Sequence, residues 1–242
     1  MKFISTLINR PRIYDSEDAY KLWSMNYDDE RDNLMLHYDK IILGKLISKI
    51  DLSGKIILDY GCGTGRNWDD LINRNPGKII GCDISAEMLD KLKAKFNGAA
   101  VHLIKENTLS FLTGGGCNVI ISTLVIAHIK EINNLFKEWS RVLKSNGDII
   151  LTDFHPELLA NGGERTFNHN GKSITIRNYI HHVAEIEYMF SSLGFKTAEL
   201  IEKNIDEEVK IFYEKHNALN VYEKYKGLPF IYGIHLSRRN AD

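Results

Sequence analysis

A glycine-rich turn restricts the fold of this chain more than any other feature. The turn runs over 61–65 and lies between a predicted strand at 55–60 and a predicted helix at 66–74. The strand pattern is apolar without alternation, which indicates burial on both faces. Such strands are typical of parallel sheets covered by helices. Ligands bind to these sheets at the carboxyl ends of the strands, where the strand order reverses. The turn therefore predicts a ligand site at the end of the first strand.

The rest of the chain repeats the alternation of strands and helices. Further strands are predicted at 78–83, 100–104, 117–122, 148–153, 195–202 and 230–236. Helices are predicted at 41–50, at 85–96, along 135–143 up to a stop at 145–147, and at 183–193. One further helix is predicted with its apolar face along 209–219 and its end at 227–229. This order predicts an α/β, Rossmann-like fold with a seven-stranded, mostly parallel sheet and helices on both faces.

Composition narrows the class of protein. The chain has 242 residues, 43% of them hydrophobic, and a formal net charge of -1. These values favour one folded domain and argue against a basic surface for duplex nucleic acid. Three cysteines without a close pair argue against a disulfide framework. We also find no apolar stretch of about 18 residues, and we expect a cytoplasmic protein without a membrane segment.

Acidic residues flank the glycine turn. Asp59 precedes glycines at 61, 63 and 65, a spacing that differs from the G-x-G-x-x-G pattern of dinucleotide sites. A carboxylate there would repel a phosphate but suits a cationic amine. Asp83, at the end of the second strand, can accept two hydrogen bonds from a ribose diol. The pattern therefore indicates a nucleoside ligand with a cationic group, and the alternative is a tightly packed turn without a ligand.

These segments resemble the class I S-adenosylmethionine-dependent methyltransferases, of the small-molecule type similar to quinone-biosynthesis enzymes. The D-x-G-x-G-x-G turn and the segments 81–89, 122–129 and 141–148 carry the resemblance, which covers residues 54–154. It implies a single domain over 1–242, with an N-terminal helical lid at 1–50 and a cofactor-binding core at 54–154. The remaining sheet follows at 155–242, with insertions at 155–180 and 204–228 that we expect to cap the acceptor. We call these two insertions the cap.

The resemblance also implies a set of cofactor-binding residues. The glycines would line the methionine part, with Asp59 near the ammonium, and Asp83 would hold the ribose. Glu106 stands where the family often has aspartate near the adenine, and Asn107 is the alternative contact. The full implied set is Asp59, Gly61, Cys62, Gly63, Gly65, Asn67, Asp83, Ile84, Met88, Glu106, Asn107, Thr108, Ser122, Thr123 and Leu124.

Acceptor residues are expected from the strand ends and from the lid. A phenol, enol, thiol or amine acceptor must lose a proton, which a neutral histidine or a carboxylate can take. His155 follows the fifth strand and is our candidate for the base or an acceptor-orienting group; a loop-anchoring histidine is the alternative. Tyr27 is the second catalytic candidate, on one helix face with Trp23. The expected acceptor pocket comprises Tyr14, Trp23, His155, Phe167 and Tyr179.

The remaining histidines and cysteines discussed here are interpreted as structural residues. His128 is interpreted as a packed histidine with its partners satisfied. Cys62 and Cys82 end neighbouring strands, so we expect them to lie near each other as small packed residues. His181 and His182 point to different faces of a helix, which argues against a metal clamp. We predict no metal site.

The sequence thus predicts methyl transfer from S-adenosylmethionine to a small-molecule acceptor, with S-adenosylhomocysteine as product. Methylation of oxygen, nitrogen or carbon stays open, as does the oligomeric state. A protein or nucleic-acid methyltransferase is the first alternative. The segment 122–125 lacks the prolines and aromatic ring that hold a flipped base, which argues against nucleic acid. A non-catalytic cofactor-binding module is the alternative of another class, and a nicotinamide oxidoreductase is disfavoured by the glycine spacing.

Overall fold

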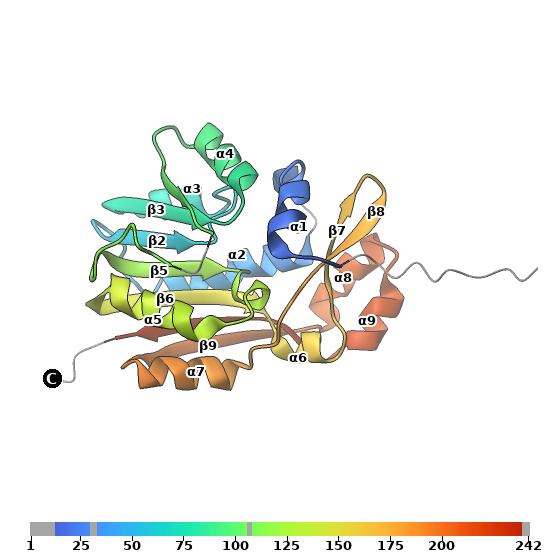
Figure 1. Cartoon of the computed structure of the whole chain (residues 1–242). Helices are drawn as coiled ribbons and strands as arrows, with labels where there is room; N and C mark the ends of the chain where they lie inside the picture. The colour runs from blue at the N-terminus through green and yellow to red at the C-terminus, as the bar shows by residue number, and fades with distance from the viewer. Residues whose placement is uncertain (1–12, 30–32, 106–107, 239–242) are drawn as a thin grey trace, which may run out of the picture.

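The computed structural model describes residues 13–29, 33–105 and 108–238. Its main feature is a seven-stranded sheet (Figure 1). In spatial order the strands are β4 (Ala100–Leu103), β3 (Lys78–Asp83), β2 (Ile56–Tyr60), β5 (Cys117–Thr123), β6 (Leu143–Phe154), β10 (Pro229–Ser237) and β9 (Lys196–Asn204). The first five strands pair in parallel, and β10 is antiparallel to both of its neighbours. The predicted seven-stranded, mostly parallel sheet is confirmed.

The strand order reverses beside β2. The chain moves outward from β2 to β3 and β4, and then returns to the other side of β2 to form β5. The loops that follow β2 and β5 therefore leave the sheet in opposite directions, which opens a crevice at their carboxyl ends. The glycine turn directly follows β2, so it lies at this crevice, as the sequence predicts.

Helices cover both faces of the main sheet. One layer contains α2 (Leu34–Ile47), α3 (Trp68–Ile72) and α4 (Ala86–Lys95), and the other contains α5 (Ile132–Val142) and α7 (Val183–Ser192). Successive residues of β2 serve opposite layers: Ile57 packs with α2, whereas Leu58 packs with α5. Burying each such side chain contributes about 1.5–3 kcal/mol. Two-sided burial explains why the strand pattern is apolar throughout.

A second, smaller sheet lies at the carboxyl end of the parallel strands. Its strands are β1 (Ile13–Tyr14), β8 (Lys172–Ile176) and β7 (Arg165–His169). Asn170 and Gly171 join β7 to β8 with φ angles of 51° and 75°, which suit a tight hairpin turn. Figure 1 shows this hairpin beside α1 (Ser16–Trp23), α8 (Glu207–Lys215) and α9 (Leu219–Tyr225). The short elements η1 (Tyr27–Asp29), η2 (Ile126–His128) and α6 (Pro156–Ala160) complete the described chain.

Three predicted helices differ from those in the structure. The helix expected along 135–143 ends at Val142, because Leu143 pairs with Cys117 and begins β6, which continues through 145–147. The single helix expected along 209–219 is two helices, α8 and α9. Asn217 separates them with a φ of 54°, a left-handed conformation that asparagine tolerates.

The helix expected to carry both Trp23 and Tyr27 also ends early. Helix α1 stops at Trp23, where the Ser24 hydroxyl donates to the Lys21 carbonyl oxygen, and Tyr27 begins η1. Such side-chain bonds to the backbone compete with helix continuation. The two rings still meet, with centroids 4.9 Å apart. Among the described residues, no helix is both long enough and apolar enough to cross a bilayer.

Candidate functional site

The glycine turn has a backbone that only glycine fits well. Gly61 and Gly63 have φ angles of 74° and 53°, in the left-handed region. A Cβ atom on Gly61 would lie 2.2 Å from Cγ2 of Val125, which is far inside contact distance. The Gly61 amide donates to the Cys82 carbonyl oxygen at 2.7 Å and draws the turn onto β3. The turn thus approaches two neighbouring segments too closely for a side chain.

Asp83 fixes the turn from the end of β3. Its two carboxylate oxygens accept hydrogen bonds from the Gly63 amide at 2.8 Å and the Ser85 amide at 2.9 Å. Burial raises the pKa of Asp83, and these amide bonds act in the opposite direction. Each carboxylate oxygen has a second lone pair. Asp83 can therefore hold the turn and still accept hydrogen bonds from a ligand.

A small cavity of about 80 Å³ opens between the turn and the N-terminal segment, and we call it the turn cavity. Eight of its lining residues are predicted cofactor-binding or catalytic residues. These are Tyr27, Gly61, Gly63, Asp83, Ile84, Met88, Thr123 and Leu124. The other eight are not among the predicted site residues. These are Ser16, Tyr20, Tyr60, Ile104, Val125, His128, Ile129 and Arg165.

Several predicted cofactor residues lie behind the turn instead of lining either cavity described here. The Asp59 carboxylate is 3% exposed and accepts a hydrogen bond from the Trp68 indole at 2.8 Å. Burial raises the pKa of Asp59 to about 7. Asn67 donates to the Thr123 hydroxyl at 3.2 Å. Cys62, Gly65 and Ser122 also lie away from both cavities, Thr108 is exposed, and Glu106 and Asn107 fall outside the described residues.

The two cysteines lie together, as predicted. The Cys62 amide donates to the Cys82 carbonyl oxygen at 3.0 Å, and both thiols are buried and free. Burial raises the pKa of each thiol well above its ordinary value. Neutral, buried thiols are poor nucleophiles, so these contacts fit the expected packing role.

The N-terminal segment is fastened over the glycine turn. The Thr64 hydroxyl donates to the Asp28 carboxylate at 2.6 Å, and Lys95 pairs with the same carboxylate at 3.1 Å. Arg66 hydrogen-bonds to Tyr27 and pairs with buried Asp39 of α2 at 2.5 Å. Polar contacts therefore join η1 and α2 to the turn.

Arg165 is the charged group of a buried cluster beside the turn cavity. Its Nη1 donates to the Leu124 carbonyl oxygen at 3.0 Å and lies 3.2 Å from His128 Nε2. The guanidinium is 5.6 Å from the ring centroids of both Tyr20 and Trp23. Leu124 has a φ of 60°, an uncommon conformation for leucine that accompanies the approach of its carbonyl to Arg165.

His128 is neutral in this cluster. Its Nδ1 lies 3.1 Å from the Arg177 carbonyl oxygen, so Nδ1 carries the hydrogen and Nε2 accepts. The Tyr20 hydroxyl donates to Nε2 at 3.0 Å. Burial and the Arg165 charge lower the pKa of His128 to about 3. His128 thus has its partners satisfied, as the sequence analysis expected, but it also lines the turn cavity.

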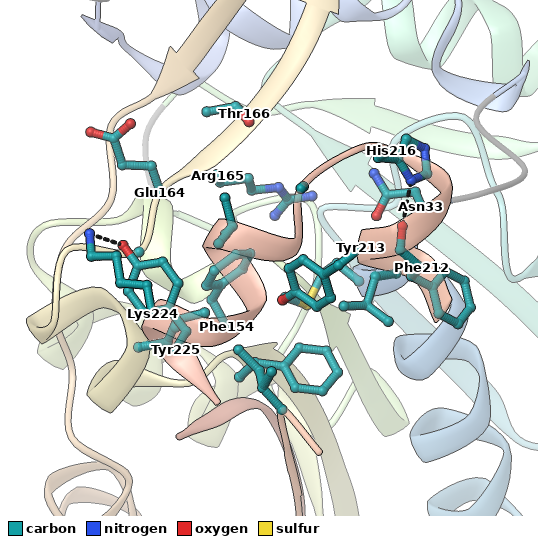
Figure 2. Close-up of a pocket in the computed structure, with 18 of the residues that line it drawn as sticks. Asn33, Phe154, Glu164, Arg165, Thr166, Phe212, Tyr213, His216, Lys224 and Tyr225 are labelled. Atoms are coloured by element: carbon teal, nitrogen blue, oxygen red, sulfur yellow. Dashed lines mark hydrogen bonds between the residues drawn. The ribbon is translucent and has the colours of Figure 1, made fainter. Parts of the chain in front are cut away.

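A second cavity, of about 1080 Å³, lies under the cap, and we call it the cap cavity. The apolar part of its wall is formed by Trp23, Leu34, Met35, Leu36, Phe154, Leu158, Ile205, Phe212, Tyr213, Val221, Tyr225 and Phe230. The polar part is formed by Asp29, Asn33, Glu164, Arg165, Thr166, His216, Asn220 and Lys224. Arg165 lines both cavities. Figure 2 shows its guanidinium directed toward Asn33 and Tyr213, whereas the Glu164 carboxylate points away from them.

The expected acceptor-pocket residues divide between wall and support. Trp23 lines the cap cavity, and Phe167 stacks behind it with ring centroids 4.7 Å apart. Tyr14 pairs with Ile176 in the small sheet. The Tyr179 amide donates to the Ala127 carbonyl oxygen at 2.7 Å. Of the predicted acceptor residues, Trp23 thus borders the cavity, while Tyr14, Phe167 and Tyr179 lie outside its wall.

The contacts of His155 are those of an anchor. Its Nδ1 accepts from the Glu157 amide at 3.2 Å and caps α6, and its Nε2 lies 2.9 Å from Glu202 of β9. Pro156 begins α6 and leaves His155 extended, as predicted, but this turns the imidazole toward β9. His155 lines neither cavity. These contacts favour the loop-anchoring alternative, and the role of base or acceptor-orienting group stays a prediction.

Comparisons with known proteins agree with this geometry. Residues 57–147 match the family model of a methyltransferase domain. The chain is 27% identical over 192 residues to an uncharacterized protein of Haemophilus influenzae, across 73% of this chain and 71% of that protein. It is 24% identical over 194 residues to an uncharacterized methyltransferase of Anoxybacillus flavithermus, across 74% and 88% of the two chains.

A solved structure shares the fold. The S-adenosylmethionine-dependent methyltransferase from Listeria monocytogenes aligns with a TM-score of 0.64 at 21% identity. The alignment covers 84% of this chain and 99% of the other. It therefore includes much of the chain outside residues 57–147, the part that the family model matches.

Proposed function

We propose that this chain, which is a class I S-adenosylmethionine-dependent methyltransferase, transfers the methyl group to a small organic acceptor bound in the cap cavity. One observation carries this proposal: the cap cavity and the turn cavity meet at Arg165. The cap cavity, at about 1080 Å³, is slightly larger than the roughly 300–1,000 Å³ typical of small-molecule sites.

The residues of the turn cavity fit the cofactor. Gly63 leaves open space where a side chain would stand, and Asp83 offers free lone pairs to a ribose diol. Ile84 and Met88 supply an apolar wall suited to a purine ring. When bound, S-adenosylmethionine supplies an electrophilic methyl group on a sulfonium. The donor set and the wall therefore match the two ends of its nucleoside.

The N-terminal segment must move to admit the cofactor. The turn cavity, about 80 Å³, is well below the roughly 300 Å³ expected for such a ligand. Tyr20 and Tyr27 form its wall on the N-terminal side. The Asp28 contacts to Thr64 and Lys95 hold η1 down and are partly exposed. Exposed polar contacts are weak, so they add little to the cost of moving η1, while α1 keeps its buried contacts to His128 and Arg165.

The shape of the cap cavity favours an apolar body on the acceptor. Its aromatic and aliphatic wall would exclude water from the reacting groups, which strengthens electrostatic interactions there. In an in-line displacement, an acceptor lone pair forms the bond to the methyl carbon while the carbon–sulfur bond breaks and its electrons stay on sulfur. Orientation by the cavity wall is the main contribution that this reaction needs from the protein.

The cluster beside the turn cavity is poorly suited to take a proton. The Tyr20 hydroxyl already occupies His128 Nε2, and the pKa of His128 is lowered to about 3. Burial raises the pKa of Tyr20, so its hydroxyl stays protonated. We infer that the acceptor nucleophile is neutral with a free lone pair or already ionised when it binds.

The test is transfer of labelled methyl from S-adenosylmethionine to a cell extract separated into small-molecule, protein and nucleic-acid fractions. We expect label in the small-molecule fraction, and its loss in Asp83→Ala. Asp90→Asn, on the exposed face of α4, is the matched control and should retain transfer. Label confined to protein or nucleic acid would overturn the acceptor class.

A further inference from the structure

We propose that Arg165 binds a carboxylate on the acceptor, so that the substrate is a small organic anion with an apolar body. This inference deepens the proposed function and rests on it. It concerns the group that orients the acceptor, and it leaves open which atom receives the methyl group.

The first observation is that Arg165 is buried without an ion pair. Arg165 is only 5% exposed. It forms no salt bridge with any carboxylate of the described residues. Its hydrogen-bonding neighbours, the Leu124 carbonyl and His128, are both neutral. Buried charges in proteins are normally paired, because the loss of hydration is costly. An unpaired buried guanidinium therefore indicates that an anion completes the site.

The nearest buried carboxylate is already engaged. Asp153 interacts with Arg165 through space, but its oxygens accept hydrogen bonds from the Ala127 and Phe154 amides at 2.8 and 2.7 Å. Burial raises the pKa of Asp153 to about 6. These amide bonds hold the carboxylate in place, so Asp153 does not serve as the direct partner of the guanidinium.

The second observation is where the free donors lie. Both hydrogen bonds of Arg165 to described residues involve Nη1, which leaves Nε and Nη2 as further donors. Figure 2 shows the guanidinium directed into the cap cavity. A guanidinium presents parallel N–H groups that match the two oxygens of a carboxylate. The acceptor would thus meet a two-pronged donor at the boundary of the two cavities.

The third observation is that the guanidinium is held in place before a ligand binds. The Tyr20 and Trp23 rings lie 5.6 Å from it, and the Leu124 carbonyl holds Nη1. An arginine fixed in this way loses little conformational freedom when it pairs with a ligand. The rigidity of the cluster favours binding at this position over a flexible surface contact.

The charge of the site favours a carboxylate over a phosphate. His128, the cationic candidate nearest to Arg165, is kept neutral, so the cluster offers one positive charge. Lys224 also lines the cap cavity, but so do the acidic residues Asp29 and Glu164, so the wall adds no net positive charge to that of Arg165. A doubly charged phosphate in a partly apolar cavity needs more compensation than one guanidinium gives. A single carboxylate needs only one positive charge, which the guanidinium supplies.

The experiment passes the unlabelled small-molecule fraction of the extract over a strong anion exchanger at pH 8 and then assays the retained and the unretained compounds for methyl transfer. We expect the methyl acceptor among the retained compounds. Arg165→Met should raise the apparent KM for that retained fraction about 50-fold. Its Kd for S-adenosylhomocysteine should stay within about twofold of wild type, which also reports correct folding. Arg165→Lys keeps the charge, so its apparent KM should rise less. Arg177→Met is the matched control, because this exposed residue directly follows β8 of the same small sheet.

Three results would overturn the inference, and they are distinguishable. An acceptor in the unretained fraction, with Arg165→Met as active as wild type, would leave the proposed function intact and remove the carboxylate. A large loss of S-adenosylhomocysteine affinity in both Arg165 variants, with no change in acceptor KM, would assign the guanidinium to the cofactor. No label in any small-molecule fraction would overturn the proposed function and this inference together.

Discussion

Trp139 and Trp23 are almost equally buried, at 0% and 1% exposure, but they lie in regions built in different ways. Trp139 lies on α5 and packs against the main sheet, next to Phe136 one helical turn away. Trp23 stacks on Phe167, a residue of the cap that is distant in the sequence. The main sheet is held by continuous strand ladders and two helical layers. The region around Trp23 is held by a few stacked rings and the Arg165 cluster.

This difference separates stability from function. The main sheet supplies a rigid edge that fixes the glycine turn and Asp83. In the proposed function, the cap and the N-terminal segment supply the wall that moves when the cofactor and the acceptor bind. Regions that move during function are drawn from the less stable parts of a fold. Four predictions test this contrast, from the largest expected effect to the smallest.

The two tryptophans give the most direct comparison. We expect Trp139→Ala to lower the free energy of unfolding by about 3–5 kcal/mol, because it leaves a large cavity in the core. Trp23→Ala should lower the global value by less than half as much, since its surroundings can open locally, but should reduce methyl transfer at least tenfold. Urea unfolding and label transfer measure the two effects. Equal losses of global stability would show that both regions unfold as one unit.

A glycine pair tests the rigidity of the turn. We expect Gly61→Ala to lower the free energy of unfolding by about 3 kcal/mol, because the new Cβ meets Val125 and the backbone φ is 74°. Binding of S-adenosylhomocysteine should be lost with it. Gly44→Ala is the control in α2, where a Cβ meets nothing within 4 Å, and should stabilise the protein by about 0.5–1 kcal/mol. Tight binding in Gly61→Ala would contradict the role of the turn.

Asp59 gives a pH-dependent prediction. Its pKa is raised by burial from 3.8 to about 7 in the folded protein. Between these values the folded state holds a proton that the unfolded state has released, so stability falls as pH rises. Asp59→Asn removes this dependence. The difference in unfolding free energy between the variant and wild type should grow by about 1–3 kcal/mol in favour of the variant from pH 5 to pH 8. Urea unfolding at each pH measures it. A constant difference across that range would show that Asp59 is ionised throughout.

The smallest effect is expected in the cap. The Tyr222 hydroxyl donates to Glu207 at 3.0 Å and joins α9 to α8. Tyr222→Phe should lower the free energy of unfolding by about 0.5–1.5 kcal/mol and leave the affinity for S-adenosylhomocysteine unchanged. Calorimetry of folding and of binding would check both. A loss of cofactor affinity would mean that the cap and the glycine turn are coupled.

Prediction from sequence succeeded where one motif contains its own partners. The apolar strands, the glycine turn and Asp83 follow one another along the chain, and the predicted helix at 85–96 begins where the Ser85 hydroxyl accepts from the Met88 amide. Arg165 could not be found in this way. Its role depends on β7 meeting Leu124 and Tyr20, and the residues around it in sequence show no motif.

Two predicted residues were displaced by partners that local sequence does not reveal. Asp59 has the right place in the motif, but Trp68 of α3 draws its carboxylate behind the turn. His155 ends the right strand, but Glu202 of β9 and the start of α6 turn its imidazole away. In both cases the backbone position was correct, and a tertiary hydrogen bond decided where the side chain points.

A crystal structure with S-adenosylhomocysteine tests the central claim most directly, namely that cofactor and acceptor occupy two cavities that meet at Arg165. We expect the ribose hydroxyls within hydrogen-bond distance of the Asp83 carboxylate, and the sulfur on the side of Leu124 that faces Arg165 and the cap cavity. A sulfur directed away from Arg165, or S-adenosylhomocysteine bound in the cap cavity, would contradict the proposed arrangement.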